Sequence, residues 1–468
     1  MNAPILWILL PLVFAVGLLL IARWQRLCRA VGSAFALLLT ASALLLPVGE
    51  IVQLGIVSFE IQPSWVVLGR RFVIDELDRP YVLLIYLVVT FWFIGSLSQT
   101  TSLLFIPLGM ALGGTLIAAI FIKPFYYGAI LLLFAALLNI VWFVSDENAL
   151  DLGIKRYWIF QTLAMPLLVL AGWLIGGTEA NPGDIPAAAL IYGLLLLGFS
   201  LLLSNVPFQS WLPAVAQRVK PYSFSLTIFL TPFTALVFVL TFLRQASWLL
   251  SSPWIVLFFS IQGFLMVILG GIGAIYHRHI GRWMGYALMK EIGLSLLLIG
   301  LGIGLSDPRP FFAMLFMQIV PRGLALALGG FAANLYAEQG KGLGLQQLVG
   351  IGRHYPVATL GYFLAVLTLV GFPLLASFPV HLTLWQAWFQ RFPPFAFAAI
   401  FGSVGVLIGG LRSLAVLVRT VDPMQASNLE SRPQKLLILV GSVLLLLMGV
   451  FPQWFLFPFY QMGLAFFR

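Results

Sequence analysis

The chain has 468 residues, of which 61% are hydrophobic and 9% charged, with 40 Phe and 14 Trp. This balance excludes a soluble globular protein and is typical of a chain that folds with lipid as its solvent. The net charge of +10 does not indicate a nucleic-acid-binding protein, because the basic residues are scattered over loops and no soluble module presents them. The one cysteine, Cys28, excludes disulfides and cysteine-based metal sites.

Apolar runs long enough to cross a bilayer recur along the whole chain, with only short polar joints between them. They predict an all-α polytopic membrane protein with about 14 transmembrane helices in one membrane domain. The first run, Met1 to Ile21, has no basic n-region and no small-residue cleavage site, so we expect a span and not a secretory signal. The predicted helices begin near residues 3, 29, 80, 101, 123, 156, 186, 221, 251, 282, 308, 356, 394 and 434.

The segment from Glu50 to Pro80 is too polar to cross the membrane. Its VSFEIQ and WVVLGRRFVID stretches alternate between apolar and polar residues, which predicts a short hairpin on the membrane surface.

The charges of the loops predict the orientation of the chain. With the N-terminus outside, most basic residues fall in inside loops, and the basic residues of the outside loops are fewer and partly offset by acids. This positive-inside bias places both termini on the outer side of the cell membrane. The inside residues would be Arg23, Arg26, Arg29, Lys155, Arg156, Arg218, Lys220, Arg278, Arg282, Lys341, Arg353, Arg419, Arg432 and Lys435.

Few ionisable residues remain inside the spans once the loops are set aside: Lys290, Glu291, Arg322 and Arg412. A charge at the centre of a membrane helix costs roughly 2.5 to 3.5 kcal/mol, so such residues are by default candidates for an ion or proton pathway. His381 joins them because an imidazole titrates near neutral pH. The sequence contains no phosphate-binding loop, haem ligation pattern or Cys/His metal set, so we expect no cofactor and no metal.

Several predicted spans carry internal prolines: Pro232, Pro321, and the pair Pro373 and Pro379 in GFPLLASFPVH. Proline kinks a helix and frees a backbone carbonyl, which the membrane tolerates only where protein or water satisfies it. Broken helices of this kind are typical of transporters, although proline is also simply commoner in membrane helices than in soluble ones.

Four segments together resemble the antiporter-like subunits of respiratory complex I, membrane hydrogenases and multisubunit cation/proton antiporters. FVIDELDRPYVLLIYLVV resembles the family's F-x-x-D-x-L entry into the third helix, and VPFQSWLPAVAQRVKPYSFSL its P-F-H-x-W-L-P signature. GRWMGYALMKEIGLSLL resembles K-R-x-L-A-Y-S-S-I-x-Q-x-G, and the run from 345 to 381 resembles L-x-x-L-G-G-L-x-x-x-x-P followed by G-x-P-x-x-G-F. The resemblance implies 14 core helices with two inverted repeats.

The family moves protons along a chain of buried ionisable groups, and the first half of this sequence has lost them. The positions of the family's helix-5 glutamate, helix-7 lysine and helix-8 lysine fall at Ala136, Leu202 and Thr234, and the signature histidines are Gln209 and Gln217. Since Leu and Ala bind no proton, we expect the first half-channel not to conduct by the family's route.

The second half keeps polar residues at the family positions. Arg322, preceded by Gln318, stands where the family has a lysine preceded by histidine, and His381 stands at the terminal Lys or Glu after the helix break. Arginine holds a counter-ion but does not shuttle protons as lysine does. Arg412 matches a family arginine and is expected to be largely structural, whereas Glu291 sits where the family usually has glutamine and Lys290 has no charged counterpart.

Lys290 and Glu291 are sequence neighbours and so about 100° apart around a helix, which suggests that each needs its own partner. One hypothesis pairs Glu291 with Arg322 and lets Lys290 exchange protons with a water path towards His381. The alternatives are a buried ion pair that only fixes helix register and a Lys290 that snorkels to the interface. The other charge cluster, residues 145 to 156, is expected to be a solvated inside loop.

The sequence therefore predicts an antiporter-like membrane subunit of a multisubunit proton- or cation-translocating complex, with Lys290, Glu291, Arg322, His381, Gln318 and Arg412 as pathway candidates. Its partners would be other membrane subunits, lipid, and protons or Na⁺. Open alternatives are a non-conducting structural subunit, or a membrane partner in an antiporter or an inorganic-carbon uptake system. The expected parts are residues 1–100 with the surface hairpin, a first repeat at 101–250, a second at 251–420, and a C-terminal helix with an amphipathic tail at 421–468.

Overall fold

The structure is a computed structural model that describes residues 2–54, 57–147, 151–180, 185–303, 305, 307–339, 342–420 and 428–466. In this part of the chain, ten helices of at least 18 residues are apolar enough to cross a membrane. Shorter apolar helices stand at Ile5–Leu20, Phe105–Phe121, Pro186–Leu202 and Pro356–Val370. The predicted all-α fold is confirmed, and each predicted helix start lies close to an observed one; the number of actual crossings stays a prediction.

The described residues form two compact units. The first contains Met1–Leu97, Ser102–Phe208 and Leu230–Leu249. Its helices are η1 (Ile5–Leu9), α1 (Leu10–Leu20), α2 (Gln25–Leu45), η2 (Glu76–Asp78), α3 (Arg79–Ser96), α4 (Phe105–Phe121), η3 (Phe125–Tyr127), α5 (Gly128–Glu147), α6 (Leu152–Ala180), α7 (Ile185–Leu202) and the second part of α9 (Pro221–Gln245).

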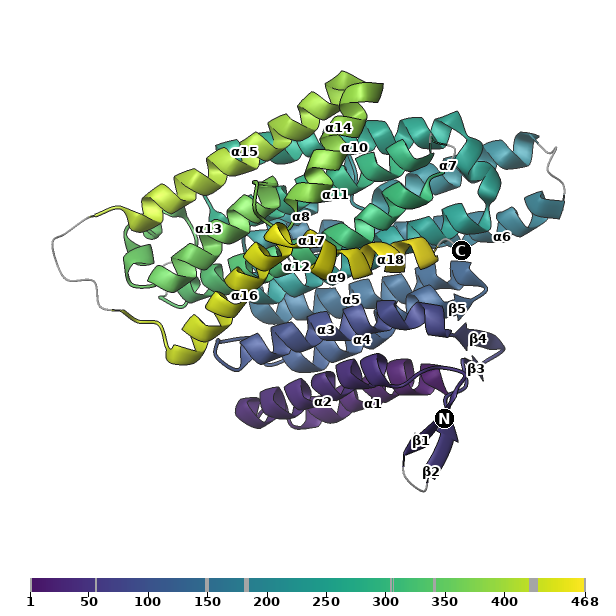
Figure 1. Ribbon diagram of the computed structural model, residues 1–468, viewed down its shortest axis with the longest axis horizontal. Helices are drawn as coiled ribbons and strands as arrows, with labels where there is room; N and C mark the ends of the chain where they lie inside the picture. Colours follow the sequence, from purple (N-terminus) through teal and green to yellow (C-terminus); the bar gives the residue numbers. More distant parts are fainter. Residues whose placement is uncertain are drawn as a thin grey trace. The chain divides into compact units, whose positions relative to one another are not determined.

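The polar segment after α2 forms strands, as predicted, but it makes two hairpins instead of one. Strands β1 (Ile51–Leu54) and β2 (Val57–Glu60) pair antiparallel, with Ile51 opposite Glu60. Strands β3 (Ser64–Val67) and β4 (Arg70–Val73) form the second hairpin, and β5 (Ile122–Lys123) extends it. The β1–β2 hairpin projects away from the helices of its unit (Figure 1).

The second unit contains Ser98–Thr101, Gln209–Phe229 and Leu250–Arg468. All six pathway candidates lie in helices of this unit. Its helices are α8 (Trp211–Ala216), the first part of α9, α10 (Pro253–Tyr276), α11 (Ile280–Ile303), α12 (Arg309–Ala337), η6 (Leu345–Gln347), η7 (Ile351–Arg353), α13 (Pro356–Val370), α14 (Phe378–Arg391), α15 (Pro393–Val418), α16 (Arg432–Val450), α17 (Pro452–Phe455) and α18 (Phe457–Phe466). Two short helices, η4 (Phe208–Ser210) and η5 (Ser247–Ser251), stand at the borders of the units.

Glycines let α10 pack backbone to backbone between α11 and α15. A Cβ on Gly263 would lie 2.7 Å from the carbonyl oxygen of Gly293 in α11, and one on Gly271 would lie 2.7 Å from the Cα of Gly402 in α15. Close approach through small residues is the usual way in which membrane helices associate, since lipid provides no hydrophobic force between them. This packing holds α11 firmly, and α11 is buried along almost its whole length.

The internal prolines have different outcomes. α9 continues through Pro232 and α12 continues through Pro321, so neither proline ends its helix and the expectation of a break there is wrong. The segment with Pro373 and Pro379 is a true break, because α13 ends at Val370 and α14 begins at Phe378. A helix tolerates an internal proline when its neighbours satisfy the freed carbonyl. The break also contains two residues with positive φ, Gly371 and Leu374, and this conformation does not continue a right-handed helix.

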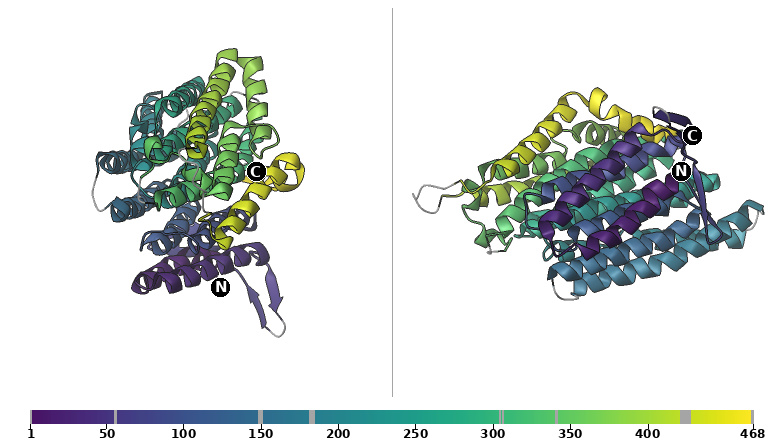
Figure 2. Two further views of the ribbon diagram at one scale, coloured as in Figure 1. Left: turned by 90° about the vertical axis from the view of Figure 1, so that its left-hand side faces the viewer. Right: turned by 90° about the horizontal axis from the view of Figure 1, so that it is seen from below.

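The C-terminal tail folds back onto its own unit. After α16, which packs against α13, the chain turns, and α18 lies along α12. Gly463 faces Ala313 closely, and the rings of Phe316 and Phe466 are 5.7 Å apart. Both views of Figure 2 show this yellow segment turning between α16 and α18.

Candidate functional site

A buried carboxylate, Glu291 of α11, is the centre of the candidate site. Its Oε2 accepts hydrogen bonds from Arg322 Nε at 3.0 Å and from Gln318 Nε2 at 3.1 Å, both from α12. Gln318 and Arg322 are four residues apart, which places both on one face of α12. The expected pairing of Glu291 with Arg322 is therefore present.

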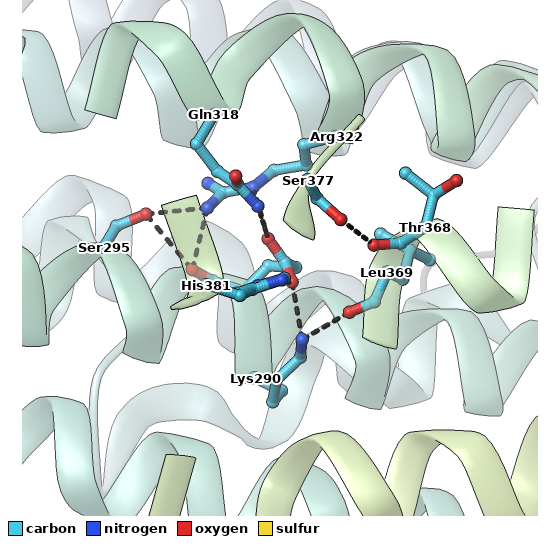
Figure 3. A network of polar contacts seen from close by, with 9 residues as sticks. Lys290, Ser295, Gln318, Arg322, Thr368, Leu369, Ser377 and His381 are labelled. Carbon is cyan, nitrogen blue, oxygen red and sulfur yellow. Dashed lines mark hydrogen bonds and ion pairs between the residues drawn. The ribbon is translucent and has the colours of Figure 1, made fainter. Parts of the chain in front are cut away.

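The second carboxylate oxygen, Oε1, faces two other groups. Lys290 Nζ donates to it at 2.6 Å, and His381 Nε2 lies 3.4 Å away, close enough for an ion pair when the ring is protonated. Lys290, Glu291 and His381 are each at most 1% exposed. Figure 3 shows Lys290, Arg322 and His381 converging on this carboxylate from three helices.

Lys290 and Glu291 do not have separate partners, contrary to the expectation from the angle of about 100° between neighbouring helix positions. Lys290 and Glu291 form a direct ion pair, although 100° separates their Cα–Cβ bonds. The long lysine stem bends back to reach the neighbouring carboxylate, because both side chains are fully buried and a buried charge needs a partner. Since Lys290 is 0% exposed, the snorkelling alternative is excluded.

Arg322 also ties α12 to the backbone of α11. Its Nη2 donates to the carbonyl oxygen of Glu291 at 3.0 Å and to Ser295 Oγ at 2.9 Å, and Ser295 in turn donates to the same carbonyl at 3.1 Å. The guanidinium therefore has ionic and neutral partners in a fixed geometry. Sequence reasoning missed Ser295, although its position one turn after Glu291 was a signal that could have found it.

The break between α13 and α14 meets the charge cluster. Lys290 Nζ donates to the carbonyl oxygen of Leu369, and Ser377 Oγ donates to that of Thr368 (Figure 3). Both carbonyls lie at the C-terminal end of α13, where backbone oxygens carry partial negative charge, and that of Thr368 also accepts from Gly371 N at 3.0 Å. Gly371 adopts a left-handed conformation with φ of 81° and leaves room for the ring of His381, which a Cβ there would strike.

The cluster carries an excess of cations. Lys290 and Arg322 are both ionic partners of the single carboxylate of Glu291. Buried charges require such pairing, because each uncompensated charge in a low-dielectric interior costs several kcal/mol. Three buried polar atoms of the cluster have no hydrogen-bond partner among the described residues: Gln318 Oε1, His381 Nδ1 and His381 Nε2.

Arg412 has its contacts elsewhere. From α15 its guanidinium donates to the carbonyl oxygens of Ile275 at 2.5 Å and His277 at 2.6 Å, at the end of α10. A cation is favourable there because it meets the negative end of the helix dipole. These contacts agree with the structural role expected for Arg412 and bring it no partner in the Glu291 cluster.

In the first unit, the positions of the family's lost ionisable residues are apolar or neutral. Ala136 is buried, Leu202 is buried, and Thr234 pairs with Tyr81 through their hydroxyls at 3.1 Å. Asn139 Nδ2 donates to the hydroxyls of Tyr157 and Thr231 at 3.2 and 3.0 Å.

The described residues of the charge cluster at 145–156 and the glutamines Gln209 and Gln217 lie outside the Glu291 cluster. Of the charge cluster at 145–156, Lys155 and Arg156 are exposed, but they lie near the start of α6 and not in a loop, and residues 148–150 lie outside the described residues. Gln209 and Gln217 are half-buried in the second unit. Within the described residues, no three His, Cys, Asp or Glu side chains come together as ligands for a metal ion.

Comparison with known proteins identifies the family. The model of the transmembrane region of NADH:quinone oxidoreductase and Mrp antiporter subunits matches residues 85–409. Since this match covers more than half of the chain, the protein belongs to this family of multi-pass membrane subunits, and the resemblance drawn from the four sequence segments is confirmed.

The similar proteins of known name are subunits of NADH-quinone oxidoreductase. Subunit N of Methylovorus glucosotrophus is 26% identical over 277 residues, which are 57% of this chain and 55% of that protein. Subunit N of Sphingopyxis alaskensis is 26% identical over 335 residues, 68% of this chain and 67% of that protein. The chain thus aligns with little more than half of the first of these relatives.

Solved structures show the same fold. A chain of the Mrp complex from Dietzia superimposes with a TM-score of 0.79 at 16% identity, covering 99% of this chain and 96% of that one. A chain of respiratory complex I from Thermus thermophilus with bound NADH gives a TM-score of 0.73 at 18% identity and covers 99% of each chain. At such low identity the likeness supports the architecture alone.

Proposed function

We propose that this family member is an antiporter-like membrane subunit of a proton-translocating complex of the complex I type, and that its second half carries the protons. The observation that supports this most directly is the shared oxygen: Lys290 Nζ and His381 Nε2 both face Oε1 of Glu291, at 2.6 and 3.4 Å. Lysine, histidine and the carboxylate can each gain and lose a proton, whereas the guanidinium of Arg322 stays protonated.

In the proposed step, a proton leaves Lys290 and reaches His381 across the carboxylate. The ammonium N–H bond breaks, the proton passes by way of Oε1 of Glu291, and an N–H bond forms at the imidazole. The net charge of the cluster stays constant during this transfer, which avoids the cost of creating a new buried charge.

The remaining groups position the relay. Arg322 and Gln318 hold Oε2, so that Oε1 is left for Lys290 and His381. The carbonyl of Leu369 orients the lysine at the broken end of α13. His381 Nδ1, buried and without a partner among the described residues, is the atom at which we propose that the relay exchanges protons with its surroundings, whereas Gln318 Oε1 can only accept a hydrogen bond.

The first half does not conduct by the family's route in this proposal. Ala136 and Leu202 bind no proton, and Thr234 is already hydrogen-bonded to Tyr81. Protons would therefore enter and leave through the second half only. Other membrane subunits of the complex are the proposed partners, the cell membrane is the proposed location, and both termini lie on its outer side.

The test is proton pumping by the assembled complex in proteoliposomes. Lys290→Met and His381→Phe are each expected to lower pumping at least tenfold, while Arg412→Lys, outside the cluster, should retain most of it. Assembly is checked by quantifying the partner subunits that co-purify with each variant. Full pumping by correctly assembled Lys290→Met and Glu291→Gln variants would exclude the relay.

A non-conducting structural subunit is the second candidate. The saturation of Glu291 favours it, because three hydrogen-bond donors already hold the carboxylate and a buried ion pair can serve only to fix the packing of helices. This candidate predicts that Lys290→Met impairs assembly in proportion to any loss of pumping, whereas the relay predicts a normal complex that pumps poorly.

A further inference from the structure

The short connection between α10 and α11 forms a second basic site, distinct from the Glu291 cluster. We call it the α10–α11 corner and define it by Tyr276, His277, Arg278, His279 and Arg282. The corner is held rigidly: Ile280 N donates to the carbonyl of Leu343 at 3.0 Å, and Leu345 N donates to that of Arg278 at 3.0 Å.

His277 positions Arg282 at this corner. Its ring stacks on Tyr286 with centroids 4.9 Å apart, and its Nε2 lies 3.0 Å from the tyrosine hydroxyl. Its Nδ1 lies 3.4 Å from Arg282 Nη1. Burial and the cations Arg282 and Arg412 lower the pKa of His277, so the ring is neutral at pH 7 and its Nδ1 accepts from the guanidinium.

In the part of the chain that the structure describes, the basic side chains of the corner have no acidic partner. Among the described residues, no ion pair joins a carboxylate to Arg278 or Arg282, and Arg278 is exposed. The backbone offers no negative charge either, since Arg412 already takes the carbonyls of Ile275 and His277. Burial and Arg282 lower the pKa of His279 to about 4, and its buried Nδ1 has no hydrogen-bond partner among the described residues.

An apolar stripe on α10 leads to the corner. Trp254, Leu257 and Ile261 are 65%, 49% and 41% exposed, and they recur at the spacing of one helix face. Leu265, Ile268 and Ile272 continue that face as half-buried residues, and Tyr276, 75% exposed, ends it. Tyrosine is enriched at the level of the lipid headgroups, so the corner lies where a membrane surface is expected.

We infer that the α10–α11 corner binds the phosphate headgroup of an anionic phospholipid whose acyl chains lie on the apolar stripe of α10. Arg278 and Arg282 supply planar guanidinium groups, which bind phosphate oxygens in a bidentate manner. Neutral His279 supplies a further hydrogen-bond donor. The proposed lipid site does not depend on proton conduction, so its test is independent of the test of the proposed function.

The experiment measures lipid binding to the purified chain in detergent by native mass spectrometry and thermal unfolding. The probes are dioleoyl phosphatidylglycerol, dioleoyl phosphatidylcholine and inorganic phosphate. The test variant is Arg278→Ala with Arg282→Ala. The matched control is Arg353→Ala with Arg419→Ala, which removes the same charge from two exposed arginines of the same unit.

We expect phosphatidylglycerol, but not phosphatidylcholine, to bind the wild-type chain and the control and to raise their unfolding temperatures. Binding should weaken about thirtyfold in the test variant, because each basic residue near an anionic lipid surface contributes roughly fivefold. Arg278→Gln alone, at an exposed position, should weaken it about fivefold. Equal binding by test variant and control would overturn the inference, and so would equal stabilisation by inorganic phosphate, since the lipid would then add nothing to the anion.

Discussion

The two units of this protein treat buried polar groups in opposite ways. In the second unit, α11, α12 and α14 bring one carboxylate, two cations and an imidazole together in a place with almost no exposure. In the first unit, the buried groups are hydroxyls and amides such as Tyr81, Thr234 and Asn139. Neutral hydrogen bonds can be satisfied in pairs, whereas a buried charge needs a network.

The difference between the units indicates that protons can be held in the second unit. Both units are helical and apolar, so hydrophobic burial does not distinguish them. The units differ in their buried titratable side chains, which contact one another in the second unit. Loss of a single charge there should therefore lower the stability of the second unit. The following changes test that contrast, from the largest expected effect to the smallest.

Glu291→Ala is expected to have the largest effect. It leaves Lys290 and Arg322 buried without their carboxylate, which should lower the free energy of unfolding by about 3–5 kcal/mol. The double variant Glu291→Gln with Arg322→Gln removes one charge of each sign and should lose less. Reversible unfolding in mixed micelles measures both, and equal stability of the two variants would contradict a charge-paired cluster.

Ala136→Glu places a carboxylate in the first unit, where the structure has an apolar position with 0% exposure. We expect the free energy of unfolding to fall by roughly 2.5 to 3.5 kcal/mol, since a carboxylate buried among apolar residues of a membrane helix is costly. Ala136→Leu is the control for added volume. If the glutamate variant were as stable as the leucine variant, the first unit would have to contain a hidden partner for the charge.

Asn139→Leu removes the amide that donates to Tyr157 and Thr231. Loss of these neutral hydrogen bonds should cost about 1–3 kcal/mol, because the buried tyrosine hydroxyl loses a partner. Proton pumping should be unaffected, since we place the relay in the second unit. A specific loss of pumping at normal stability would assign conduction to the first unit as well.

Ser295→Ala is expected to have the smallest effect, about 1 kcal/mol, because Arg322 keeps its bonds to Glu291 when the hydroxyl is removed. Thermal unfolding measures the change, and Ser295→Thr should restore it. A loss as large as that of Glu291→Ala would mean that Ser295, and not the carboxylate, fixes the guanidinium.

Much of the fold could be predicted from the residues alone. Long apolar runs report helices because each run is local and lipid requires every backbone group to be satisfied within it. The polar segment after α2 predicted strands for a similar reason, although the number of hairpins was wrong. The prolines were less informative: α12 continues through Pro321, and only the segment with Pro373 and Pro379 breaks.

The members of the candidate site could also be found, because so few charges occur in the spans. Lys290, Glu291, Arg322, Gln318 and His381 do meet, whereas Arg412 lies at the end of α10. The roles of the Thr368 and Leu369 carbonyls could not be foreseen, since every residue has a carbonyl and only the position of the helix end brings these two to the cluster.

Hydropathy and rarity of charge, which are properties of neighbouring residues, thus determined the helices and named the ionisable groups. Other features depend on helices that are far apart in the chain. They are the contact of both Lys290 and His381 with Oε1 of Glu291, and the hydrogen bond of Lys290 to the end of α13. The packing of α11 against α8, α10, α12 and α15, in part through close glycine contacts, sets the position and rotation of α11. Side chains a few ångströms long find their partners according to that rotation, which no local pattern encodes.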